Sequence, residues 1–92
     1  GGVLVFKIGG RMFATAALEP GDHLLSFKCS PDDFAELVER EGVIPAPYLA
    51  RAQWVSLQTD DAVKAPELKR LLRMAYDLVF AKLTKKAQRE LI

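Results

Sequence analysis

The residues best suited to chemistry are few and widely separated in this chain of 92 residues. It holds one histidine, His23, and one cysteine, Cys29. A catalytic nucleophile needs an adjacent base, and a metal site needs several ligands at a suitable spacing. Neither arrangement is recognisable around these two residues, so we expect no catalysis, no metal and no cofactor. We expect His23 to be solvated or bonded to the backbone at the start of a strand, and Cys29 to lie in the core.

Acidic residues gather on one predicted helix surface. Carboxylates there could hold hard cations weakly, but a binding site needs oxygen ligands that converge from other segments as well. The sequence indicates no such second set, so we interpret these residues as helix caps and solvent contacts. The acidic residues of this surface are Asp32, Asp33, Glu36, Glu39 and Glu41.

Basic residues offer a clearer hypothesis, because they are concentrated at the C-terminal end. Residues 1–63 include five Lys or Arg against nine Asp or Glu, whereas residues 64–92 include eight against three. Such clusters attract phosphate backbones or acidic partners, although a solvated helix surface is the alternative. Tyr48 and Trp54 could add base stacking, but a tryptophan in an alternating strand is more often buried. The candidate nucleic-acid-binding residues are Lys64, Lys69, Arg70, Arg73, Lys82, Lys85, Lys86 and Arg89.

Whether these cations form one surface depends on helix geometry. At about 100° per residue, an unbroken helix centres Lys69, Arg70 and Arg73 on one side and the last four cations roughly 160° away. A continuous helix therefore splits the charge into two patches. A break at Thr84 could instead rotate the second cluster beside the first.

The elements that must position these side chains begin with a β-hairpin over residues 3–18. Two apolar runs flank Gly9-Gly10, and two glycines supply the positive φ angles of a two-residue primed turn. This turn places Phe6 opposite Phe13, so the sequence predicts an aromatic pair on one face of the hairpin. The opposite face is expected to hold Val5, Met12 and Ala14.

Further strands and helices follow the hairpin. Alternating apolar residues predict strands over 23–29 and 53–58, and helical spacing predicts helices over 31–41 and 66–83. Ser30 is the expected N-cap of the first helix, and Gly42 its expected end. Pro45 and Pro47 predict an irregular segment between that helix and the last strand. Thr84 either caps a short final helix, or the long helix continues.

Length and composition limit the class of protein. The chain is expected to form one domain, 1–92, with its core between a sheet and a few helices. No stretch approaches the roughly 18 consecutive apolar residues of a membrane span. One cysteine excludes an internal disulfide, and no charged and apolar leader precedes the hairpin, so we expect a cytoplasmic protein.

Three segments together resemble the bacterial MmcQ/YjbR family. They are FKIGGRMFA over 6–14, PYLARAQWV over 47–55 and AYDLV over 75–79. Their order and spacing extend the resemblance over nearly the whole chain. The resemblance implies a two-layer α+β domain, with an antiparallel sheet packed against helices in the order β-β-β-α-β-β-α. It also implies that the family's N-terminal helix is missing here, and that the outline is similar to type III secretion chaperones and frataxin.

The resemblance implies a function as well. Members of the family are commonly described as DNA-binding proteins with a double-wing motif. We therefore expect a DNA-binding module that uses the basic C-terminal region for non-specific phosphate contacts and performs no catalysis. The alternative is a protein interaction or chaperone-like domain, in which the sheet face or the missing-helix surface meets a partner or a second copy. A small-molecule binder would require a concave pocket with converging polar groups.

Overall fold

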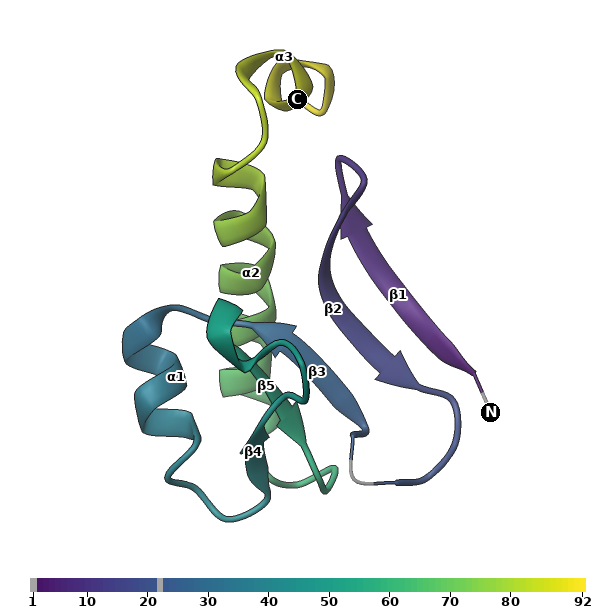
Figure 1. Ribbon diagram of the computed structural model, residues 1–92, viewed down its shortest axis with the longest axis vertical. Coiled ribbons are helices and arrows are strands. Elements are labelled where there is room, and N and C mark those ends of the chain that lie inside the picture. The colour runs from purple at the N-terminus through teal and green to yellow at the C-terminus, as the bar shows by residue number, and fades with distance from the viewer. Residues whose placement is uncertain (1, 22) are drawn as a thin grey trace.

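A five-stranded antiparallel sheet carries helices on one face in the computed structural model, which describes residues 2–21 and 23–92 (Figure 1). The sheet has the order β1-β2-β3-β5-β4, so β1 and β4 form its edges. The predicted α+β class and element order are confirmed. The strands are β1 (Val3–Ile8), β2 (Arg11–Ala17), β3 (Leu25–Lys28), β4 (Val43–Pro45) and β5 (Trp54–Leu57). The helices are α1 (Pro31–Leu37), the 3₁₀ turn η1 (Ala50–Ala52), α2 (Ala65–Ala81) and α3 (Lys85–Glu90).

The core lies between one face of the sheet and the helices α1 and α2. Phe27 of β3 and Val55 of β5 are fully buried there. They belong to one apolar cluster with Leu37 of α1 and Leu71 of α2. These positions agree with the alternation of apolar residues in the strands and with their helical spacing in α1 and α2. The longest helix, α2, covers much of this face of the sheet.

The hairpin turn forms at Gly9-Gly10, as predicted. Their φ angles of 59° and 81° lie in the left-handed region that only glycine adopts readily. A side chain at Gly9 would also collide with Leu83, whose Cδ1 would lie 2.6 Å from an added Cβ. The tip of the hairpin therefore packs closely against the segment that joins α2 to α3.

The register of the hairpin differs from the prediction. A bulge beside Phe6 shifts the pairing, so that Phe6 lies opposite Ala14 rather than opposite Phe13. Phe13 is the extra residue, and its ring packs edge-on against Tyr76 of α2 with 5.5 Å between centroids. The two phenylalanine rings remain neighbours at 6.4 Å. Ala14, expected on the opposite face, is instead buried in the core beneath α2.

Local capping fixes where two helices begin. The hydroxyl of Ser30 accepts a hydrogen bond from the backbone N–H of Asp33 at 3.1 Å, so α1 starts as predicted. The hydroxyl of Thr84 likewise accepts from the N–H of Ala87 at 3.1 Å. The long helix is therefore broken at Thr84, and α3 is a separate helix. Of the helices in the described residues, none is long and apolar enough to cross a bilayer.

The strand β4 was not predicted from its own residues. Pro45 and Pro47 indicated an irregular segment, but β4 pairs with β5 and places Pro45 opposite Val55. A proline is tolerated in an edge strand, because the missing N–H can face away from the neighbouring strand. The resemblance had implied two strands after the first helix, and the structure agrees with it.

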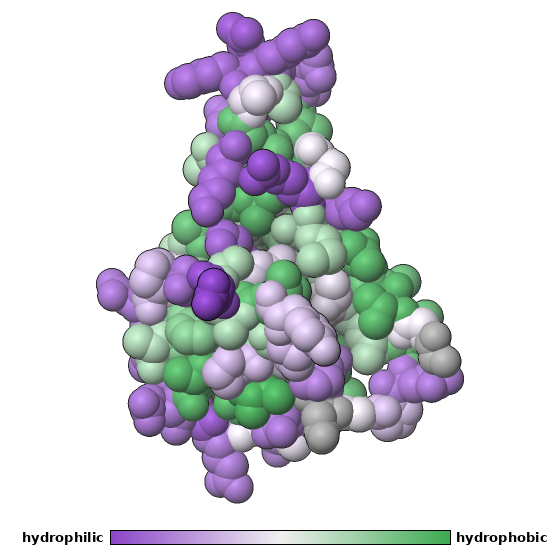
Figure 2. Space-filling model, in the orientation of Figure 1, coloured by the Kyte–Doolittle hydropathy of each residue, from purple (hydrophilic) through white to green (hydrophobic). Residues whose placement is uncertain are grey.

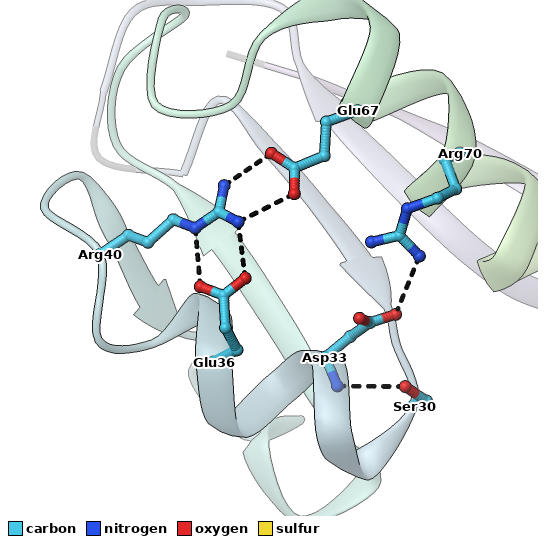
Figure 3. A network of polar contacts seen from close by, with 6 residues as sticks. All are labelled: Ser30, Asp33, Glu36, Arg40, Glu67 and Arg70. Atoms are coloured by element: carbon cyan, nitrogen blue, oxygen red, sulfur yellow. Dashed lines mark hydrogen bonds and ion pairs between the residues drawn. The ribbon is translucent and has the colours of Figure 1, made fainter.

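Arg40 links the end of α1 to the start of α2 (Figure 3). Its guanidinium donates to both carboxylate oxygens of Glu67 at 2.7 and 2.8 Å, and its Nε donates to Glu36 at 2.8 Å. The hydrogen bonds from Arg40 hold the pKa of Glu67 below its usual value. Paired bonds of this kind fix geometry as well as charge, so Arg40 orients the two helices.

We expect Arg40→Met to lower the free energy of unfolding by about 1 kcal/mol at pH 7, because two bidentate pairs are lost. Glu67 has a lowered pKa in the folded state, so its contribution is present above the unfolded pKa of about 4.3. The difference from wild type should therefore shrink as the pH falls from the unfolded pKa through the lower folded pKa. Urea titrations at pH 7 and pH 3 measure it, with Arg70→Met as the control. An equal loss of unfolding free energy at both pH values would contradict a stabilising ion pair between Arg40 and Glu67.

Candidate nucleic-acid interface

The eight cations predicted from the sequence fall into two groups along the C-terminal helices. The first group lies before and within the N-terminal half of α2: Lys64, Lys69, Arg70 and Arg73. Two of these side chains already face carboxylates. Arg70 Nη1 lies 3.5 Å from Asp33 of α1, and Arg73 Nε lies 3.2 Å from Asp77 one turn later. Half of the first group is therefore partly neutralised within the protein.

The second group lies at the C-terminal end of α2 and in α3. It consists of Lys82, Lys85, Lys86 and Arg89. The side-chain amide of Gln88 donates to the backbone oxygens of Phe80 at 3.0 Å and Leu83 at 3.1 Å, which ties α3 to the end of α2. Hydrophilic residues cover this end of the molecule, at the top of Figure 2.

The break at Thr84 does not unite the two groups. Arg70 and Lys82 are twelve residues apart, which is about 18 Å along the axis of α2. The helix α3 lies beyond the end of α2, at the far end from α1 (Figure 1). Distance along the axis of α2 therefore separates the two groups, whatever the rotation of α3.

Two further cations, from the sheet, join the second group. Arg11 of β2 and Lys28 of β3 line the same cavity as Lys82, with a volume of about 350 Å³. Among the described residues that line this cavity, none is acidic. We call these two cations together with the second group the basic end: Arg11, Lys28, Lys82, Lys85, Lys86 and Arg89.

Sequence analysis missed Arg11 and Lys28 because both belong to predicted strands within residues 1–63, the part of the chain that is acidic overall. One signal could have found Arg11. It follows Gly9-Gly10 directly, so it must lie at the tip of the hairpin, where side chains are exposed. Nothing local indicates that this tip meets the end of α2, since that contact depends on tertiary packing through Leu83.

The cavity has an excess of positive charge at its wall. Lys28 Nζ donates to the backbone oxygen of Ala52 at 2.7 Å, which fixes the ammonium group in place. Burial and the nearby charge of Lys82 lower the pKa of Lys28. A bound anion would offset this repulsion between like charges, so the cavity wall is suited to negatively charged groups.

The residues that could have supported other chemistry lie apart from the cavity or are buried. Cys29 is 1 % exposed, as predicted for a core residue, and its Sγ donates to the backbone oxygen of Gln53 at 3.2 Å. Burial raises the pKa of this thiol to about 11, so it is neutral at pH 7. His23 is exposed. Within the described residues, no three or more His, Cys, Asp or Glu side chains gather in a way that could hold a metal ion.

The two candidate stacking residues have different environments. Trp54 is 4 % exposed and forms part of the cavity wall, in agreement with the expectation of burial. Tyr48 is fully exposed, and its φ of 65° is unusual for a bulky residue. Tyr48 is therefore accessible for stacking on a base, whereas Trp54 presents little free surface.

The chain therefore forms a small two-layer α+β domain, in which a five-stranded antiparallel sheet is covered by two helices. Residues 1–78 match the YjbR family, so the chain belongs to the MmcQ/YjbR family. No curated protein and no solved structure matches it.

Proposed function

We propose that the protein binds nucleic acid through the basic end, by phosphate contacts that do not read sequence, and that it performs no catalysis. One observation carries this proposal: Arg11, Lys28 and Lys82 converge on one cavity from three elements, without an acidic residue among the described lining. The helix α3, which begins three residues after Lys82, adds three further cations. Phosphate contacts from Lys and Arg supply most of the affinity in non-specific binding.

The salt dependence of binding tests this proposal. We expect the logarithm of the association constant for a labelled 20-base-pair DNA duplex to fall linearly with the logarithm of salt concentration, with a slope of about −3 to −5. Fluorescence anisotropy between roughly 50 and 200 mM NaCl measures the slope. Lys82→Gln should make it shallower by about 1, whereas Lys69→Gln, outside the basic end, should leave it unchanged. A slope near zero would remove the basis for the proposal.

A second candidate function, pairing of two copies through β1, is favoured by the exposed apolar residues of that edge strand and by Leu18, which follows β2. Figure 2 shows hydrophobic residues over this part of the sheet. Five exposed apolar residues make up this surface. A fully exposed large side chain has roughly 150–250 Å² of surface, so together they offer on the order of 450 Å² per copy. Two copies would therefore bury close to the ~1,000 Å² in total that a specific interface needs. The residues and their exposed fractions are Val3 56 %, Leu4 50 %, Val5 44 %, Phe6 43 % and Leu18 60 %.

We therefore expect weak association of two copies that depends on protein concentration. Sedimentation velocity should show the mass rising from one to two chains between about 10 µM and 1 mM. Val5→Lys should prevent the rise, because a charge on an edge strand opposes pairing with another strand. Leu91→Lys changes a similarly exposed residue away from β1 and should leave it intact. A constant monomer mass over this range would exclude the candidate.

A further inference from the structure

The cavity at the basic end has the size and construction of a small-molecule site. Its volume of about 350 Å³ falls within the range of roughly 300–1,000 Å³ that is typical of ligand pockets. It is built by β2, β3, β5, the segment that precedes β5 and the end of α2. The residues that line it are Arg11, Met12, Lys28, Leu49, Ala52, Trp54, Val79 and Lys82.

The wall combines two kinds of surface. Arg11, Lys28 and Lys82 supply positive charge, and Lys28 is fixed by its bond to the backbone oxygen of Ala52. That bond uses one of the three N–H donors of the ammonium group, which leaves two for a ligand. The guanidinium of Arg11 adds a planar fork that suits two oxygens of one phosphate.

The remaining wall is apolar. Met12, Leu49, Trp54 and Val79 come from four different parts of the fold and face the same space. A bare inorganic anion would leave this surface without a partner, and a purely apolar ligand would leave the cations unused. The wall therefore favours a molecule that carries both an anionic group and a flat apolar ring.

We propose that this cavity binds a phosphate monoester of mononucleotide size, with the phosphate against Arg11, Lys28 and Lys82 and the ring against the apolar wall. The ligand could be a free mononucleotide or the 5′-terminal nucleotide of a nucleic acid strand, since the two have the same chemistry. The second source rests on the proposed function, which this proposal deepens. A phosphate monoester carries close to two negative charges at neutral pH, compared with one for each phosphate within a strand. A site with three cations therefore binds a terminal phosphate monoester more tightly than a phosphate within a strand.

Adenosine monophosphate, adenosine and inorganic phosphate together test the proposal. Trp54 is the single tryptophan, so the intrinsic fluorescence of the protein reports on the cavity wall. We expect adenosine monophosphate to change the emission and to bind at least about tenfold more tightly than either other compound, because neither contacts both parts of the wall. Isothermal titration calorimetry measures the same affinities without depending on Trp54.

Arg11→Gln should weaken the binding of adenosine monophosphate roughly tenfold, because it removes a charge-assisted contact. Lys69→Gln, the control about 20 Å along α2 from Lys82, should leave it unchanged. Equal affinity for adenosine monophosphate and inorganic phosphate would overturn the proposal, as would an Arg11→Gln variant that folds and binds normally.

The source of the ligand is distinguished with a five-nucleotide strand that carries either a 5′-phosphate or a 5′-hydroxyl. Tighter binding of the phosphorylated strand points to strand ends, and equal binding of the two strands points to the free nucleotide. Either result supports the cavity, provided that adenosine monophosphate binds as expected. Lys85→Glu/Lys86→Glu changes only residues outside the cavity wall. This variant should therefore lose most of its duplex binding and keep its binding of adenosine monophosphate. If the wild-type protein fails to bind a duplex but still binds adenosine monophosphate, the proposed function is contradicted and this inference stands.

Discussion

Replacement of Phe27 by alanine is expected to lower the free energy of unfolding by about 3–5 kcal/mol. Phe27 lies at the centre of the sheet, in β3, and its side chain has no exposed surface. It pairs with Ala14 on one side and Val55 on the other, both of which are buried in the same cluster. Neighbours on two strands and the helix above hold their positions, so removing the ring leaves a cavity that collapses only in part.

Phe6→Ala provides a matched control for this prediction. Phe6 lies on the same face of the sheet but in the edge strand, and 43 % of it is exposed. Its removal should cost clearly less, about 1 kcal/mol, because nearly half of its surface is already in water. Urea unfolding followed by circular dichroism measures both variants. Since domains of this size have total stabilities of about 5–15 kcal/mol, Phe27→Ala should shift the transition strongly. Equal losses for the two variants would show that the core is placed incorrectly.

Most of the fold could be predicted because the local and tertiary preferences agree. Gly9-Gly10 can satisfy a primed turn almost wherever it occurs, and Ser30 before Pro31 can cap a helix without help from the rest of the chain. The spacing of Leu71 and Ala75 indicates a buried helix face for the same reason. In each case the information lies within a few residues, so no knowledge of distant contacts is needed.

The errors arose where distant contacts decide. The bulge in the hairpin moves Phe13 onto the ring of Tyr76, which lies more than sixty residues later in the chain. A prediction that counts residues outward from the turn cannot anticipate it. The strand β4 exists because β5 offers a partner, although Pro45 disfavours a strand locally. Both corrections are tertiary effects that override local signals.

The candidate site was less predictable than the fold for a related reason. The basic region was found by counting charge along the chain, which selects residues that are close in sequence. The cavity instead brings Arg11 and Lys28 from the strands beside Lys82 from the end of α2. Counting also could not show that Arg70 and Arg73 face carboxylates. Charge composition therefore indicates one end of the chain, but not the set of residues that share one surface.

Reversal of two charges on α3, Lys85→Glu/Lys86→Glu, is expected to weaken binding of a DNA duplex by about 10–100-fold at roughly 100 mM salt. Two phosphate contacts are lost, and the new carboxylates repel the backbone. The fold should persist, because both residues are exposed and lie in the first turn of α3. Acidic side chains in the first turn stabilise a helix, because they interact with the positive end of its dipole. The slope of the salt dependence should also become shallower by about 2.

The control for this variant is Lys64→Glu/Lys69→Glu, which changes the net charge by the same amount at the other end of α2. If the net charge of the protein alone governed affinity, the two double variants would bind equally weakly. If the basic end is the contact surface, only the variant on α3 loses most of its affinity, since charges separated by more than the Debye length of about 8–10 Å are largely screened. Fluorescence anisotropy of both variants, side by side at one salt concentration, therefore separates a local interface from general electrostatic attraction.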